Sequence, residues 1–145
     1  MKESVMEKKL QTRTPLTITA NEMVTDNINN FIEFTGNVVA IKEQLTVIAD
    51  KMVVWGTKDQ LNLKKIVAIG SVKITRGKKI ATGRQAHYFP NKKKIELTGD
   101  SILYDGKNYT KGEKVVYYFD QEDMIVTGNK KKRPTLRFFP NEEKK

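Results

Sequence analysis

Apolar side chains recur at every second position on both sides of a glycine, and this arrangement appears several times along the chain. Ile32 and Phe34 precede Gly36 by four and two residues, and Val38 and Ala40 follow it at two and four. A period of two with one apolar face is typical of half-buried β-strands. The positions assigned to this apolar face are Ile32, Phe34, Val38, Ala40, Met52, Val54, Ile66, Ala68, Val72, Ile74, Ala86, Tyr88, Ile95, Leu97, Leu103, Val115, Tyr117, Met124 and Val126.

The pattern belongs to a repeat of 29 residues. Anchor glycines are separated by 34, 29 and 29 residues, and the first three are each followed 13 residues later by a small residue. A single five-residue insertion, placed at residues 56–60, explains the one longer spacing. Self-similarity at a fixed period indicates a stack of equivalent structural units. The anchors are Gly36, Gly70, Gly99 and Gly128, and the small residues are Ala20, Ala49, Gly83 and Gly112.

Each unit also carries turn signals. Seven residues after an anchor glycine lie Glu43, Gly77 and Gly106, and Asp105-Gly106 is a strong hairpin signal. A glycine inside a strand often marks a bulge or a sharp bend. Each unit is therefore predicted to contain a strand, a bend, a second strand, a hairpin and a return strand that bends at the small residue.

Strands that bend at one fixed place and stack with a constant period predict an all-β fold. The expected architecture is a bent two-sheet β-jellyroll, similar to a β-taco, whose apolar faces meet across a groove. A solenoid, in which each unit contacts only its neighbours, is the alternative. The expected boundaries are an N-terminal tail at 1–15, one domain at 16–140 and a C-terminal tail at 141–145.

The two ends of such a stack expose unpaired strand edges. The stretch Thr135-Leu136-Arg137-Phe138-Phe139 is apolar and lies between two prolines. We expect Leu136 and Phe138 to form an edge that pairs with another copy of the chain. Head-to-tail pairing of this kind does not close, so it produces filaments.

Composition restricts the function without identifying it. The chain has 145 residues, 27 Lys and Arg against 17 Asp and Glu, and a net charge of +10, which favours anionic partners. It has no cysteine, so it forms neither disulfides nor thiolate metal sites. The sequence contains no apolar run long enough to cross a bilayer as a helix and no visible signal peptide.

The sequence lacks the residue patterns of the common catalytic sites. His87 is the only histidine, and it lies out of phase with the apolar face, so a surface position is expected. Ser4, Ser71 and Ser101 are the only serines, and none lies in a GxSxG elbow. An enzyme is therefore not expected, and neither a metal nor a cofactor is predicted.

Lysine clusters lie near the predicted turns. The simplest interpretation is a solvated rim that discourages edge aggregation, and the functional alternative is a rim that meets phosphate groups. Nucleic acid is not the expected partner, because Tyr88 and Tyr117 occupy the apolar face rather than an exposed stacking platform. The clusters are Lys64-Lys65, Lys78-Lys79, Lys92-Lys93-Lys94 and Lys130-Lys131-Lys132-Arg133.

Residues 17–129 resemble the OstA-type repeat of the periplasmic lipopolysaccharide-transport family that includes LptA. The order "GNV … AD … Y … TG" at the expected spacing carries the resemblance. The stretches concerned are ITANEMV, FTGNVVAIKEQLTVIADKMVV, ATGRQAHYFPNKKKIELTGDSILY and YTKGEKVVYYFDQEDMIVTGN.

The resemblance implies a periplasmic lipopolysaccharide carrier. It implies a V-shaped jellyroll that holds the acyl chains of lipid A in its groove, with the alternating apolar residues as the contact set. It also implies head-to-tail assembly into a bridge between the membranes, with LptA-like partner domains at the inner and outer membranes, and a signal peptide already removed. The alternative is a structural or adhesive β-repeat protein with a tightly packed interior and no lipid ligand.

Overall fold

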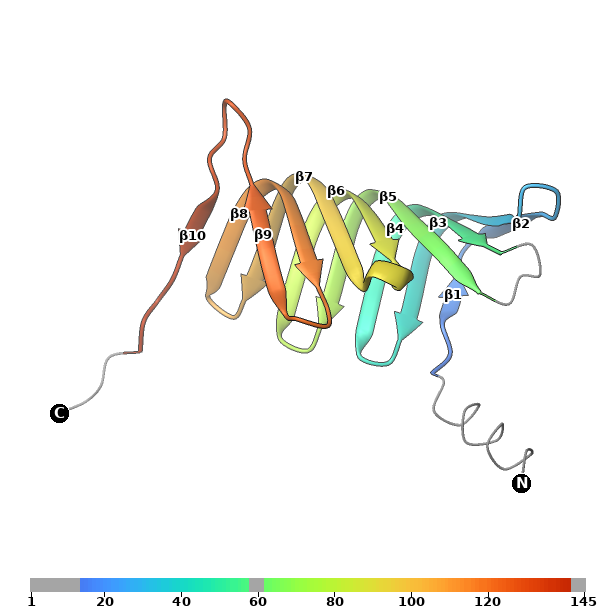
Figure 1. Cartoon of the computed structure of the whole chain (residues 1–145), viewed down its shortest axis with the longest axis horizontal. Helices are drawn as coiled ribbons and strands as arrows, with labels where there is room; N and C mark the ends of the chain where they lie inside the picture. Colours follow the sequence, from blue (N-terminus) through green and yellow to red (C-terminus); the bar gives the residue numbers. More distant parts are fainter. Residues whose placement is uncertain (1–13, 58–61, 142–145) are drawn as a thin grey trace, which may run out of the picture.

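Ten antiparallel strands form one hydrogen-bonded sheet that follows the chain in order (Figure 1). The structure is a computed structural model, and it describes residues 14–57 and 62–141. The strands are β1 (Thr17–Thr19), β2 (Glu22–Asp26), β3 (Phe31–Lys42), β4 (Leu45–Gly56), β5 (Leu63–Arg76), β6 (Lys79–Phe89), β7 (Lys94–Asp105), β8 (Asn108–Tyr118), β9 (Asp123–Thr127) and β10 (Thr135–Arg137), with a 3-10 turn, η1 (Pro90–Lys92), before β7.

A bend in each long strand folds this sheet into two arms. In β3 the pairing with β4 shifts between Thr35 and Val38, and the equivalent shift recurs in every pair through β7 and β8. Bulges of this kind bend a strand and increase its local twist. The hairpin arm comprises residues 17–19, 38–49, 72–83, 101–112 and 135–137, and the return arm comprises 22–35, 50–69, 84–98 and 113–127.

The bends lie at three of the four glycines that the repeat marks, whereas the fourth, Gly128, directly follows the end of β9. Gly99 and Asp100 both have positive φ angles, 85° and 46°, and the same combination of glycine and a polar residue occurs twice more. Glycine enters this region without the steric cost that a Cβ imposes. The other two pairs are Gly36 with Asn37 and Gly70 with Ser71.

The predicted turns are also confirmed. Glu43, Gly77 and Gly106 each adopt positive φ at the tip of a hairpin, and the chain turns again after β6 and after β8. The insertion predicted at residues 56–60 lies largely outside the described residues.

The core lies inside the fold, next to the bends. Val38, Met52 and Val72 are fully buried there, and Ser101 is buried with its hydroxyl donating to the carbonyl oxygen of Leu97 at 3.0 Å. Burying an apolar side chain of this size contributes about 1.5–3 kcal/mol, so the alternating residues at the bends hold the arms together.

The overall architecture agrees with the predicted bent jellyroll, with one refinement. The two expected sheets are halves of one continuous sheet, because each long strand passes through its bend into both arms. Figure 1 shows β1 and β2 at one end of the stack and β9 and β10 at the other. Among the described residues, no helix is long and apolar enough to span a bilayer.

Candidate functional site: an apolar cavity between the two arms

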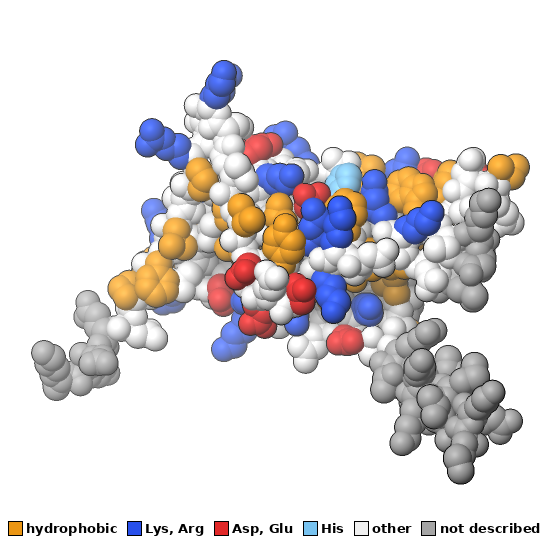
Figure 2. Space-filling view, viewed as in Figure 1, with side chains coloured by type: hydrophobic (Ala, Val, Ile, Leu, Met, Phe, Trp, Pro, Cys, Tyr) orange, Lys and Arg blue, Asp and Glu red, His pale blue; other side chains and the backbone are white. Residues whose placement is uncertain are grey.

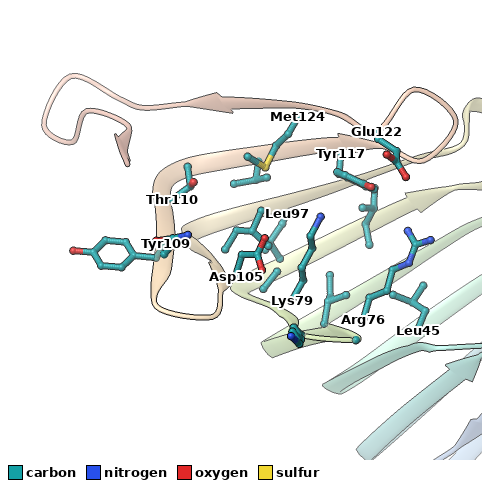
Figure 3. Close-up of a pocket in the computed structure, with 18 of the residues that line it drawn as sticks. Leu45, Arg76, Lys79, Leu97, Asp105, Tyr109, Thr110, Tyr117, Glu122 and Met124 are labelled. Atoms are coloured by element: carbon teal, nitrogen blue, oxygen red, sulfur yellow. The ribbon is translucent and has the colours of Figure 1, made fainter. Parts of the chain in front are cut away.

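The arms enclose a cavity of about 720 Å³ toward the end that carries β9 and β10 (Figure 3). This volume falls within the range of about 300–1,000 Å³ typical of ligand pockets. Ile74 and Leu103 line it from the hairpin arm, and Leu97, Val115 and Tyr117 line it from the return arm. A ligand in this cavity therefore contacts both arms.

A second cavity of about 110 Å³ lies toward the other end of the stack. Ala40 and Met52 line it together with Tyr88, and Leu45 and Ile95 line both cavities. Burial raises the pKa of Tyr88, so its phenol stays neutral at physiological pH. The shared residues place the two cavities along one interior path.

Burial falls along each strand from the bend toward the open side of the cavity. In β5, Val72 is fully buried and Ile74 is almost so, whereas Arg76 is exposed. In β7, Ser101 is buried, and Asp105 at the hairpin is exposed. The site is therefore amphipathic, with apolar walls near the bends and charged residues at the mouth.

Most of the predicted groove residues reach one of these cavities. Thirteen do so: Ala40, Met52, Ile66, Ala68, Ile74, Ala86, Tyr88, Ile95, Leu97, Leu103, Val115, Tyr117 and Met124. The other six face the same interior but do not line a cavity; Phe34, Val38 and Val72 are buried in the core, and Ile32, Val54 and Val126 pack against it.

Sequence reasoning missed several lining residues on the hairpin arm. Leu45 lies four residues before Ala49, and Ala81 lies two residues before Gly83; both line the larger cavity. The same period of two, extended backward from each small residue, identifies them. The predicted apolar face covers both sides of each anchor glycine and the stretch after each small residue, but not the stretch before it.

Leu136 and Phe138, the predicted oligomer edge, also line the larger cavity. β10 pairs with β8, with Leu136 opposite Thr110, so one of its two edges is already used within the chain. Leu136 is 69% exposed and Phe138 is 61% exposed. These side chains thus form the end wall of the cavity and remain accessible.

The cavity combines apolar walls with charged residues at its mouth. Within the described residues, no group of three or more His, Cys, Asp or Glu side chains is placed to hold a metal ion. His87 lies outside the groove, half-buried on the outer face of β6 with its ring stacked on Phe89. An apolar cavity with a charged mouth accommodates an amphiphile.

Comparison with known proteins identifies the family. Residues 17–123 match the family model described as "LptA/(LptD N-terminal domain) LPS transport protein", which is well over half of the chain. The chain belongs to this family. The lipopolysaccharide export system proteins LptA of Escherichia coli K12 and of Shigella flexneri are each 27% identical over 134 residues, covering 88% of this chain and 72% of theirs.

A solved structure supports the fold of this LptA-family member. The crystal structure of LptH, the LptA-homologous periplasmic component of the lipopolysaccharide transport device of Pseudomonas aeruginosa, superimposes with a TM-score of 0.77 at 16% identity. The match covers 87% of this chain and 96% of LptH. At this identity the likeness shows the fold.

The exposed large apolar side chains of this family member concentrate at the two ends of its stack. At one end they include Met23, Val24 and Ile28, and at the other Ile125 and Phe139 together with Leu136 and Phe138. Figure 2 shows hydrophobic side chains reaching the surface toward the β10 end. Apolar end faces of this kind are typical of surfaces that associate.

Proposed function

We propose that this chain is a periplasmic lipopolysaccharide carrier that holds the lipid's acyl chains in the cavity between its arms. The observation that carries the proposal is the apolar cavity of about 720 Å³, lined from both arms and open at a charged mouth. Membership in a family of lipopolysaccharide transport proteins supports this choice of amphiphile. The relation to LptH, a periplasmic component, supports the location.

The energetics permit passive transfer. Each buried methylene contributes about 0.8 kcal/mol relative to water, but a bilayer already provides that stabilisation to the lipid. Moving an acyl chain from a membrane into the cavity is therefore close to neutral in free energy. The carrier lets lipid pass in either direction, and an energised partner must supply the direction.

We further propose that copies of the chain stack head to tail, extending the groove into a bridge between the inner and outer membranes. The end with β1 and β2 and the end with β9 and β10 both expose apolar side chains next to short edge strands. Pairing of these edges continues the antiparallel sheet across the junction. LptA-like domains at the two membranes are the partners expected at the ends of the bridge.

A photo-crosslinking experiment tests whether lipid occupies the groove. A photoreactive amino acid at Ile74 or Leu103, which line the cavity, is expected to capture lipopolysaccharide after illumination. The same probe at Lys73 or Ile102 is the matched control, because each directly precedes one of the inward residues in the alternating strand. Equal capture at both sets contradicts the proposal, and no capture at either set favours a β-repeat protein without a lipid ligand.

A further inference from the structure

Two cations stand side by side at the mouth of the larger cavity. Arg76 ends β5 and Lys79 begins β6, and they are Cα partners across the hairpin. Both line the cavity. Figure 3 shows their side chains extending from the hairpin toward the side on which Tyr117 and Glu122 of the opposite arm lie.

Neither cation forms an ion pair with any residue that the structure describes. The Arg76 guanidinium carbon lies 6.0 Å from the centre of the Phe119 ring, on the far side of the cavity. Lys79 is the Cα partner of Asp105, but their charged groups are not in salt-bridge contact. The two positive groups are therefore available to an anion.

Arg76 and Lys79 lie directly beyond the apolar walls of the cavity, and this position favours an anion that carries acyl chains. On β5, Arg76 lies two residues beyond Ile74, which lines the cavity wall, and on β6, Lys79 lies two residues before Ala81, which does the same. An anionic headgroup at this mouth is directly continuous with acyl chains in the cavity. Side chains opposite each other across a strand pair have Cβ atoms about 5 Å apart, so both cations reach one headgroup.

We propose that Arg76 and Lys79 form a phosphate-binding subsite at the mouth of the cavity, which holds a phosphate monoester of the bound amphiphile. The inference rests on the proposed lipid-carrier function and specifies how the headgroup is placed. The guanidinium binds two phosphate oxygens through its paired N–H donors, and the ammonium adds a point charge. Headgroup binding then sets how deeply the acyl chains enter.

The contact between Arg76 and Phe119 fixes where in the cavity mouth the phosphate would lie. Because the guanidinium sits toward the ring of the opposite arm, a phosphate bound to it lies between the arms rather than on the outer surface. Asp105 and Glu122 also line the mouth and reduce its positive potential, and Lys78 at the hairpin tip adds to it. The subsite therefore depends on direct contact with these two cations and not on the net charge of the chain.

The test compares two lipids with two charge-matched double variants. The lipids are lipid A with its phosphates and the same lipid after enzymatic removal of the phosphates. The variant Arg76→Gln/Lys79→Gln removes the subsite, and Lys73→Gln/Lys130→Gln removes the same charge from exposed positions that line neither cavity. The subsite variant is expected to bind phosphorylated lipid A about tenfold more weakly than the wild type, since charge-assisted hydrogen bonds are lost.

The control variant is expected to bind both lipids like the wild type, and the subsite variant is expected to bind the dephosphorylated lipid unchanged. Equal weakening for both lipids, or no weakening for either, overturns the subsite. Circular dichroism and the thermal midpoint verify folding, and Arg76→Lys, which keeps the charge, is expected to retain part of the affinity.

Inorganic phosphate distinguishes a lipid headgroup from a free ion. Phosphate at low millimolar concentration is expected not to displace phosphorylated lipid A, because it lacks the acyl chains. If phosphate alone binds tightly to the wild type and not to the subsite variant, Arg76 and Lys79 bind a free anion. That result overturns their role in binding a lipid headgroup. If the wild type binds neither lipid, the carrier function itself fails; if it binds both equally well, only the subsite fails.

Discussion

Single residues at the bends decide whether a strand passes from one arm to the other. At Gly99 the φ angle is 85°, and an added Cβ would lie 2.8 Å from the Cβ of Arg84. Real Cβ atoms do not approach this closely, and the neighbouring atom is itself fixed to the backbone. The bend therefore needs glycine for both its backbone conformation and its close packing.

Replacing Gly99 with alanine is expected to lower the free energy of unfolding by about 1–3 kcal/mol. Gly106→Ala is the matched control, because Gly106 has a φ of 65° but an added Cβ would meet nothing within 4 Å. Urea denaturation of both variants separates the two contributions. A loss at Gly106 as large as that at Gly99 contradicts the role of close packing at the bend.

His87, on the outer face of the return arm, has a perturbed pKa that makes the stability of the fold depend on pH. Burial and the nearby Lys65 ammonium lower the pKa of His87 below its ordinary value of 6.5, with Lys114 acting in the same direction and the Glu96 carboxylate opposing it. The unfolded chain therefore binds a proton at a higher pH than the folded chain does. Stability rises with pH across that interval.

We expect the urea midpoint to fall as the pH is lowered from 7 through 6.5 toward the depressed pKa of His87. In the variant His87→Gln this part of the pH dependence is expected to disappear, because glutamine does not titrate. Urea titrations of both proteins between pH 7 and 5 provide the comparison. If the urea midpoint depends on pH equally in both proteins, groups other than His87 cause that dependence.

At the residue scale, the spacing of positions along the repeat predicted which side chains face the interior better than the residue types did. Ser101 occupies an apolar slot as the one polar exception, and its hydroxyl meets backbone carbonyl oxygens, so the alternation holds through it. The pairing of Arg76 with Lys79 at the cavity mouth was not predicted. It depends on which residues end and begin the strands at a hairpin, and a lysine-rich turn does not by itself reveal this.

At the scale of elements, β10 is the strand whose role depends most on context. It pairs with the hairpin-arm part of β8, while β9 pairs with the return-arm part of the same strand. Together they complete one end of both arms. The sequence predicted an apolar edge there, but pairing of β10 with its own β8 depends on the path of residues 128–134.

Head-to-tail assembly makes a prediction about variants at opposite ends. Leu136→Glu and Val24→Glu are each expected to suppress concentration-dependent growth in light scattering, because each places a charge on one apolar end. An equimolar mixture of the two is expected to form dimers, since each variant retains one intact end.

Two exposed apolar residues away from the ends supply the control for that experiment. Ile48 is 41% exposed and Ile69 is 38% exposed, and both lie on central strands. Ile48→Glu and Ile69→Glu are expected to leave assembly unchanged. Loss of assembly in these variants, or no dimer in the mixture of end variants, contradicts the head-to-tail arrangement.

For the whole molecule, stacking of the repeat units builds a groove, and the number of repeat units sets its length. Each long strand contributes apolar residues on both sides of its bend, so the stack builds two facing walls from one sheet. The 29-residue spacing predicted this arrangement because bends must align for the arms to fold together. The sequence predicted a groove between the apolar faces but not its volume, because the space that facing side chains leave depends on the angle between the arms.

The most direct test of the central claim is an intermolecular NOE experiment on the protein with lipopolysaccharide bound. Val115 and Val116 are adjacent and both buried, but Val115 lines the cavity and Val116 does not. With methyl-labelled valine, NOEs from the acyl methylenes are expected at Val115 and absent at Val116 and at Val53, which lies on the outer face. Cross-peaks at Val116 without cross-peaks at Val115 would contradict a lipid-binding groove between the arms.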